Sequence, residues 1–105
     1  MAENSMVELL SAVRNYLDIT WTDTATDAKL TGIIKRGMAY LDLKTGVSLD
    51  YLPEDLPRQL LLDYCLYARS NALDEFEVNY LSMLLSLQQR EEVAAYVIAQ
   101  AAIVP

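Results

Sequence analysis

A chain of 105 residues, of which 53% are hydrophobic and 22% charged, has the length and composition of one globular domain. With one cysteine and no histidine, the sequence excludes an internal disulfide framework, a multi-thiolate zinc site and imidazole catalysis. The net charge of −7 disfavours a nucleic-acid-binding function, because such binding rests on cations that displace counterions from phosphates. No basic segment precedes an apolar run at the start, so no secretory signal is expected.

Apolar residues recur at helical spacing through the first half of the chain. This spacing predicts a first helix from about Glu3 to Leu17. A loop should follow, and Thr24 with Asp27 three positions later predicts the N-cap of a second helix. That helix should end at Lys44-Thr45-Gly46, where a cation in the last turn precedes a glycine suited to a left-handed cap.

The middle of the chain predicts a central helix. A connection of about ten residues, Val47 to Pro57, should cross the molecule before a third helix that begins at Glu54 or Asp55 and ends at Asn71. Between Leu60 and Ala68 this helix is apolar on nearly every side, so other elements must cover it all round.

Two further segments complete the chain. Asp74 to Glu77 resembles a capping box and predicts a fourth helix from about Glu75 to Gln88, in a tight hairpin with the third. The run from Val93 to Val104 is almost wholly apolar, and its periodicity does not distinguish helix from strand. The fold class predicted for residues 1–105 is therefore an all-α single domain, a small bundle of four main helices plus an apolar C-terminal segment.

The apolar surplus at the end of the chain has two interpretations. The last segment either folds back as a fifth core helix or, together with the wide apolar face of the fourth helix, forms a surface for protein contacts. On the second interpretation, residues 89–105 are a possible assembly tail. The candidate subunit or partner interface consists of Val78, Leu81, Leu85, Val93, Tyr96, Val97, Ile98, Ile103 and Val104.

The sequence predicts no catalytic residues, no metal ligands and no cofactor. Gly32 and Gly37 have the spacing of a phosphate loop but lie within a helical pattern, which favours close helix packing. Asp23 and Asp27 are interpreted as capping residues, and the acids from Asp74 to Glu77 as complements of a helix dipole. Cys65 lies in the most apolar helix and is interpreted as a buried, inert thiol.

The order of elements resembles the head-tail connector family of tailed bacteriophages, the portal adaptor or neck proteins, over roughly residues 7 to 88. The matching stretches are Leu9–Asp18, Asp27–Leu30, Ile33-Ile34, Tyr40–Asp42, Thr45-Gly46, Leu56-Pro57, Tyr64, Tyr67, Arg69, Phe76, Tyr80 and Leu84–Leu87.

This resemblance implies a non-enzymatic structural protein of the virion, located at the head–tail junction and in the host cytoplasm during assembly. Its implied partners are further copies in a ring, the phage portal protein, and additional neck or tail proteins. DNA would pass through the ring without tight binding, and acids facing the channel would keep phosphates from adhering. The alternative is a small acidic regulatory or DNA-mimic protein that binds a nucleic-acid-binding partner. A helical enzyme that uses acids and a divalent metal is disfavoured, because no paired acidic motif faces a polar stripe.

Overall fold

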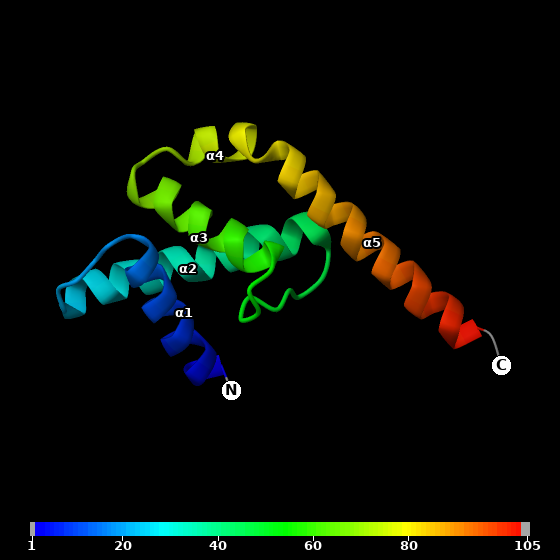
Figure 1. Cartoon of the computed structure of the whole chain (residues 1–105), viewed down its shortest axis with the longest axis horizontal. Helices are drawn as coiled ribbons and strands as arrows, with labels where there is room; N and C mark the ends of the chain where they lie inside the picture. The colour runs from blue at the N-terminus through cyan, green and yellow to red at the C-terminus, as the bar shows by residue number, and fades with distance from the viewer. Residues whose placement is uncertain (1, 104–105) are drawn as a thin grey trace.

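The computed structural model describes the backbone of residues 2–103 and the side chains of residues 5–101. Figure 1 shows an elongated helical molecule of 55 × 33 × 19 Å. Its helices are α1 (Ala2–Tyr16), α2 (Thr24–Thr45), α3 (Leu56–Arg69), α4 (Leu73–Asn79) and α5 (Leu81–Ile103). The described residues contain no strand, so the predicted all-α class is confirmed, although the division into helices differs from the expectation.

Helices α1 and α2 begin and end close to the predicted positions. The N-cap of α2 is Asp23 and not Thr24: the Asp23 carboxylate accepts a hydrogen bond from the backbone N–H of Thr26 at 3.2 Å. Aspartate is the stronger acceptor, since its charge complements the positive end of the helix dipole. The predicted C-terminal end is confirmed, because Gly46 adopts φ 76° and donates its N–H to the Asp42 carbonyl.

Helix α3 is the centre of the fold, as predicted. Its residues from Leu60 to Cys65 are all buried, and it packs against α1, α2 and α4. The contact with α2 is close at Gly37, where an added Cβ would lie 2.8 Å from Leu61 Cδ1 and 2.8 Å from Tyr64 Cδ1. Close helix packing is therefore confirmed for Gly37. At Gly32 an added Cβ would meet only the guanidinium of Arg36, at 3.4 Å, so that interpretation is wrong for Gly32.

The connection between α2 and α3 is held to the body by a buried tyrosine. The Tyr51 hydroxyl oxygen lies 2.6 Å from Asp42 Oδ1 and 3.1 Å from the Met38 carbonyl oxygen. The same Asp42 oxygen accepts the backbone N–H of Leu49 at 3.1 Å. Burial, together with the hydrogen bond to Asp42, raises the pKa of Tyr51. Tyr51 therefore anchors this long connection to α2, while the rest of the connection stays at the surface or is partly buried.

The fourth helix does not run unbroken from Glu75 to Gln88, which corrects the prediction. The chain leaves helical geometry at Tyr80, with φ −109° and ψ 13°, and separates α4 from α5. The Tyr80 ring stacks on Phe76 at 4.9 Å between centroids and meets Tyr67 edge-on at 5.6 Å. The predicted capping box is also absent, because the N-cap position of α4 is Ala72, which has no side-chain acceptor. Packing of the aromatic cluster, and not a cap, positions α4.

The C-terminal segment that periodicity left open is helical. Helix α5 continues without interruption through Val93 to Ile103. Within the part of the chain that the structure describes, no helix has both the length and the hydropathy required to cross a membrane.

Candidate interaction surface on helices α4 and α5

Helix α4 is anchored to the body on one side and exposed on the other. Phe76 is buried against Tyr40 and Tyr64, with ring centroids 6.2 and 5.6 Å away. On the outer side, Glu77 forms an ion pair with Lys44 of α2, and the hydrogen bond from Lys44 lowers the pKa of Glu77. The neighbouring Val78 is directed away from the core and is 75% exposed.

The first half of α5 packs against the body along a single stripe. Leu84 and Leu87 are buried in the core, while Leu81 and Leu85 on the adjoining face are about half exposed. Near the middle of the helix, Arg90 Nη1 lies 3.1 Å from Asp55 Oδ1, at the N-terminus of α3. The hydrogen bond from Arg90 lowers the pKa of Asp55. We define Val78, Leu81 and Leu85 as the near patch.

The second half of α5 leaves the body altogether. Every side chain from Glu92 to Ala101 is exposed, and Figure 1 shows this part of the helix projecting away from α1, α2 and α3. The interpretation of this segment as a fifth core helix is therefore wrong. We define its large exposed residues, Val93, Tyr96, Val97 and Ile98, as the far patch; their exposed fractions range from 58% to 70%.

The structure thus exposes all seven of the predicted interface residues whose side chains it describes. It separates them into two patches, with the polar segment Gln88–Glu92 between them. Of the other two predicted residues, Ile103 ends α5 but its side chain lies outside the described residues, as does the whole of Val104.

The side chains that the sequence offers as candidates for chemistry are either buried in the core or engaged in contacts that hold the fold together. Cys65 is fully buried, and desolvation raises the pKa of its thiol to about 12, so the thiol stays protonated at neutral pH. Asp23 caps α2, and Asp27 forms an ion pair with Arg14. Among the residues that the structure describes, no three metal-ligating side chains gather in one place.

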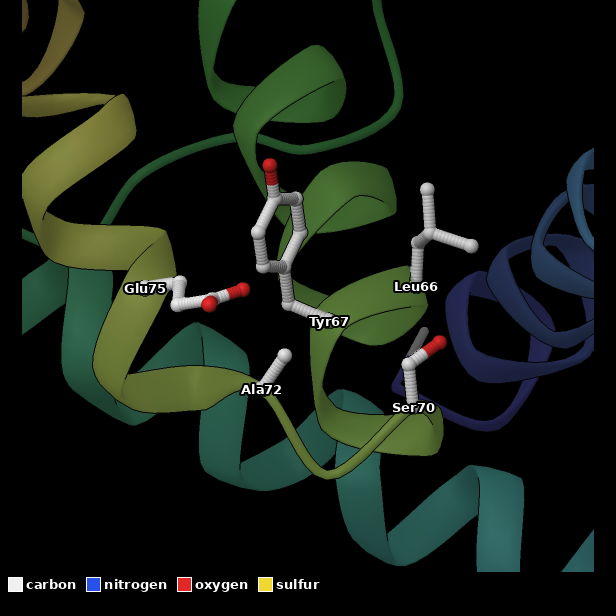
Figure 2. A pocket seen from close by; sticks show the side chains of 5 residues that line it. All are labelled: Leu66, Tyr67, Ser70, Ala72 and Glu75. Carbon is white, nitrogen blue, oxygen red and sulfur yellow. The ribbon is translucent and has the colours of Figure 1, made fainter.

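An open pocket of about 310 Å³ lies where α3 turns into α4. Figure 2 shows its lining: Leu66, Tyr67, Ser70, Ala72 and Glu75. The Tyr67 hydroxyl accepts a hydrogen bond from the Asn79 amide at 3.1 Å. Glu75 is the only charged residue of the lining, so the pocket combines a carboxylate with apolar and hydroxyl groups and offers no cation for an anionic ligand.

Sequence reasoning missed the role of two polar side chains that connect elements of the body by hydrogen bonds, Asp63 and Tyr51. Asp63 is 4% exposed on α3; it accepts hydrogen bonds from the Tyr16 hydroxyl and, at 3.0 Å, from the Gln59 amide. Tyr51 holds the long connection, as described above. A lone acid within an otherwise apolar helix was the available signal for Asp63, whereas Tyr51 lies in a loop without periodicity.

Comparison of the chain with models of protein families, with curated proteins and with solved structures found no match.

Proposed function

We propose that this protein is a non-enzymatic structural connector of a tailed phage, which forms a ring beneath the portal, extends the DNA channel and joins head to tail. The observation that carries the proposal is the second half of α5, a helix that is exposed on every side and holds no charged residue from Val93 to Ile103. A helix that is apolar all round is typical of a segment that another surface covers.

The size of the far patch supports a protein contact. Its four large side chains leave roughly 450 Å² exposed, given typical full areas for such residues. At ~25 cal/mol per Å², covering them contributes about 11 kcal/mol before the costs of association are subtracted. Together with the near patch, this exposed apolar area is larger than the area that singly scattered apolar residues contribute to the surface of a typical monomer.

The charges support a channel that passes DNA without holding it. Arg14, Lys44, Arg58 and Arg90 are each engaged in ion pairs with acids of the same chain. Among the described residues this leaves four cations without an ion pair: Lys29, Lys35, Arg36 and Arg69. Four are few beside the roughly 6–10 phosphate contacts of a DNA-binding protein, and the net charge of −7 opposes them.

The test is negative-stain imaging of the full chain mixed with the portal protein encoded in the same genome. We expect added density at one end of the portal ring, coaxial with its channel. A variant that ends at Glu92 should fold but bind the portal more weakly. Leu43→Lys, which changes a side chain that is 84% exposed on α2, serves as a control and should bind normally.

Failure of the full chain to bind the portal overturns the proposal. Specific inhibition of a DNA-binding protein by a monomer or closed dimer of this chain would instead support the alternative, an acidic regulatory or DNA-mimic function.

A further inference from the structure

The open pocket between α3 and α4 shares no residue with the near patch or the far patch. One wall is the C-terminal end of α3, which contributes Leu66, Tyr67 and the C-cap residue Ser70. The other wall is the start of α4, which contributes the N-cap residue Ala72 and Glu75. The pocket therefore combines apolar, aromatic, hydroxyl and carboxylate groups within about 310 Å³.

The walls of this pocket are held in place by the fold. The turn between the two helices passes through Asn71, which adopts φ 56°, and the backbone N–H of Ala72 donates to the Tyr67 carbonyl at 2.8 Å. The Tyr67 ring meets Phe76 edge-on at 5.7 Å between centroids, and its hydroxyl accepts a hydrogen bond from the Asn79 amide at 3.1 Å. The pocket is thus formed before any ligand arrives, so binding does not have to order it.

The electrostatics of the pocket favour a cation. Glu75 is the only charged residue of the lining, and none of the ion pairs among the described residues involves it. The N-terminus of α4 contributes roughly half a positive charge, which the full charges of Asp74 and Glu75 exceed. The other wall is the C-terminal end of α3, where the helix dipole is negative.

The shape of the lining favours one kind of cation. Figure 2 shows the Glu75 carboxylate directed toward the Tyr67 ring, with Leu66 on the other side of that ring. A guanidinium group stacks on aromatic rings and donates two parallel hydrogen bonds to a carboxylate, whereas an ammonium group is a compact, strongly hydrated charge. A lone carboxylate is too few ligands for a divalent metal ion.

The size of the pocket indicates how the cation is presented. Its volume of about 310 Å³ lies at the lower end of the ~300–1,000 Å³ typical of small-molecule sites, and the pocket is open. A free small molecule would leave much of its surface in water there. A side chain that projects from another protein is also held by the contacts around it, and arginine is among the residues that most often anchor protein interfaces.

We propose that the pocket between α3 and α4 binds an arginine side chain of a partner protein. The guanidinium pairs with the Glu75 carboxylate beside the Tyr67 ring, and the aliphatic stem of the arginine packs on Leu66. This inference goes beyond the proposed function, because it assigns a site separate from the projecting half of α5 and does not depend on which protein supplies the arginine.

The test is a nuclear magnetic resonance titration of the isotope-labelled full chain at constant ionic strength. The probe is N-acetylarginine amide, and the matched control ligand is N-acetylcitrulline amide, in which a neutral urea group replaces the guanidinium. We expect saturable shifts of backbone amide signals confined to Leu66–Glu75, with a dissociation constant in the millimolar range for so small a probe. The citrulline compound should bind at least about fivefold more weakly, because it cannot form the ion pair.

Two variants of equal charge separate the pocket from the general acidity of the chain. Glu75→Gln removes the carboxylate of the lining and should weaken binding of the arginine probe by roughly three- to tenfold. Asp74→Asn removes the neighbouring acid, which lies outside the lining, and should leave binding within about twofold of the wild type. Both side chains are exposed, and circular dichroism melting checks that both variants fold.

Shifts that are absent at ~50 mM probe, or equally strong with the citrulline compound, overturn the inference. Equal weakening by Glu75→Gln and Asp74→Asn also overturns it, since the probe would then respond only to net charge. Binding of the arginine probe tighter than ~0.1 mM would show a self-sufficient small-molecule site and refute the assignment to a partner's side chain. Because the titrations use the isolated chain, their failure leaves the connector function standing, and failure to bind the portal leaves the pocket assignment standing.

Discussion

Substitution of Gly37 by alanine tests how closely α2 and α3 approach each other. An added Cβ would lie 2.8 Å from both Leu61 Cδ1 and Tyr64 Cδ1, and both side chains are buried with little freedom to move. Overpacking of this kind costs about 1–3 kcal/mol, whereas alanine gains about 1 kcal/mol over glycine inside a helix. The overpacking cost less the helix-propensity gain leaves a decrease of up to about 2 kcal/mol in the free energy of unfolding of Gly37→Ala.

The matched control lies five residues earlier on the same helix. At Gly32, an added Cβ meets only the flexible end of the Arg36 side chain, so Gly32→Ala should gain about 0.5–1 kcal/mol of stability from helix propensity alone. Urea denaturation followed by circular dichroism measures both values, provided that the slopes of the transitions agree. If Gly37→Ala stabilises the protein as much as Gly32→Ala does, the close contact between α2 and α3 is refuted.

A double-mutant cycle identifies the side chain responsible. Leu61→Ala alone should cost about 2–5 kcal/mol, because Leu61 is fully buried. In the Gly37→Ala background the same change should cost less, since it removes one of the two clashes and the new methyl group fills part of the cavity. A coupling free energy of ~0.5–3 kcal/mol is expected for residues in contact, and additive effects would contradict the geometry.

The remaining predictions concern the loop, the titrating core, the projecting helix and DNA. Tyr51→Phe should lower the free energy of unfolding by about 1–3 kcal/mol in urea denaturation, because it removes the hydroxyl that donates to two part-buried acceptors, and an unchanged stability would refute the anchoring of the connection. The pKa of Cys65 rises from 9.0 to about 12 on folding. The contribution of the protonated thiol to the free energy of unfolding is therefore complete below pH 9 and is lost as the pH rises toward 12. The buried Tyr51 hydroxyl acts in the same direction from its ordinary pKa of 10.0 upward, so the free energy of unfolding should fall between about pH 9 and about pH 12. Truncation after Glu92 should leave cooperative melting intact, and loss of the fold would show that the removed residues belong to the core. Labelled duplex DNA titrated at ~150 mM salt should show no micromolar binding, and tighter binding would contradict the passive channel.

Much of the candidate surface could be predicted from composition and spacing. The run from Val93 to Val104 is almost wholly apolar, in a chain whose four predicted helices already supply a core. A segment that stays uncovered in the monomer was therefore one of the two open interpretations. The division into two patches could not be predicted, because Leu84 and Leu87 are as apolar as Leu81 and Leu85. Which of these leucines is buried depends on the orientation of α5 against α2.

The sequence by itself determined the all-α class, the central position of α3 and the end of α2 at Gly46, because these follow from local periodicity, local hydropathy and a single backbone conformation. Only the tertiary structure decided the break at Tyr80, where stacking on Phe76 and the edge-on contact with Tyr67 outweigh the local preference for a continuous helix. It also decided the burial of Tyr51 and Asp63, whose hydrogen-bond partners Asp42 and Tyr16 lie 9 and 47 residues away in the chain. Contacts between residues so far apart depend on how whole helices pack, and no window of neighbouring residues carries that information.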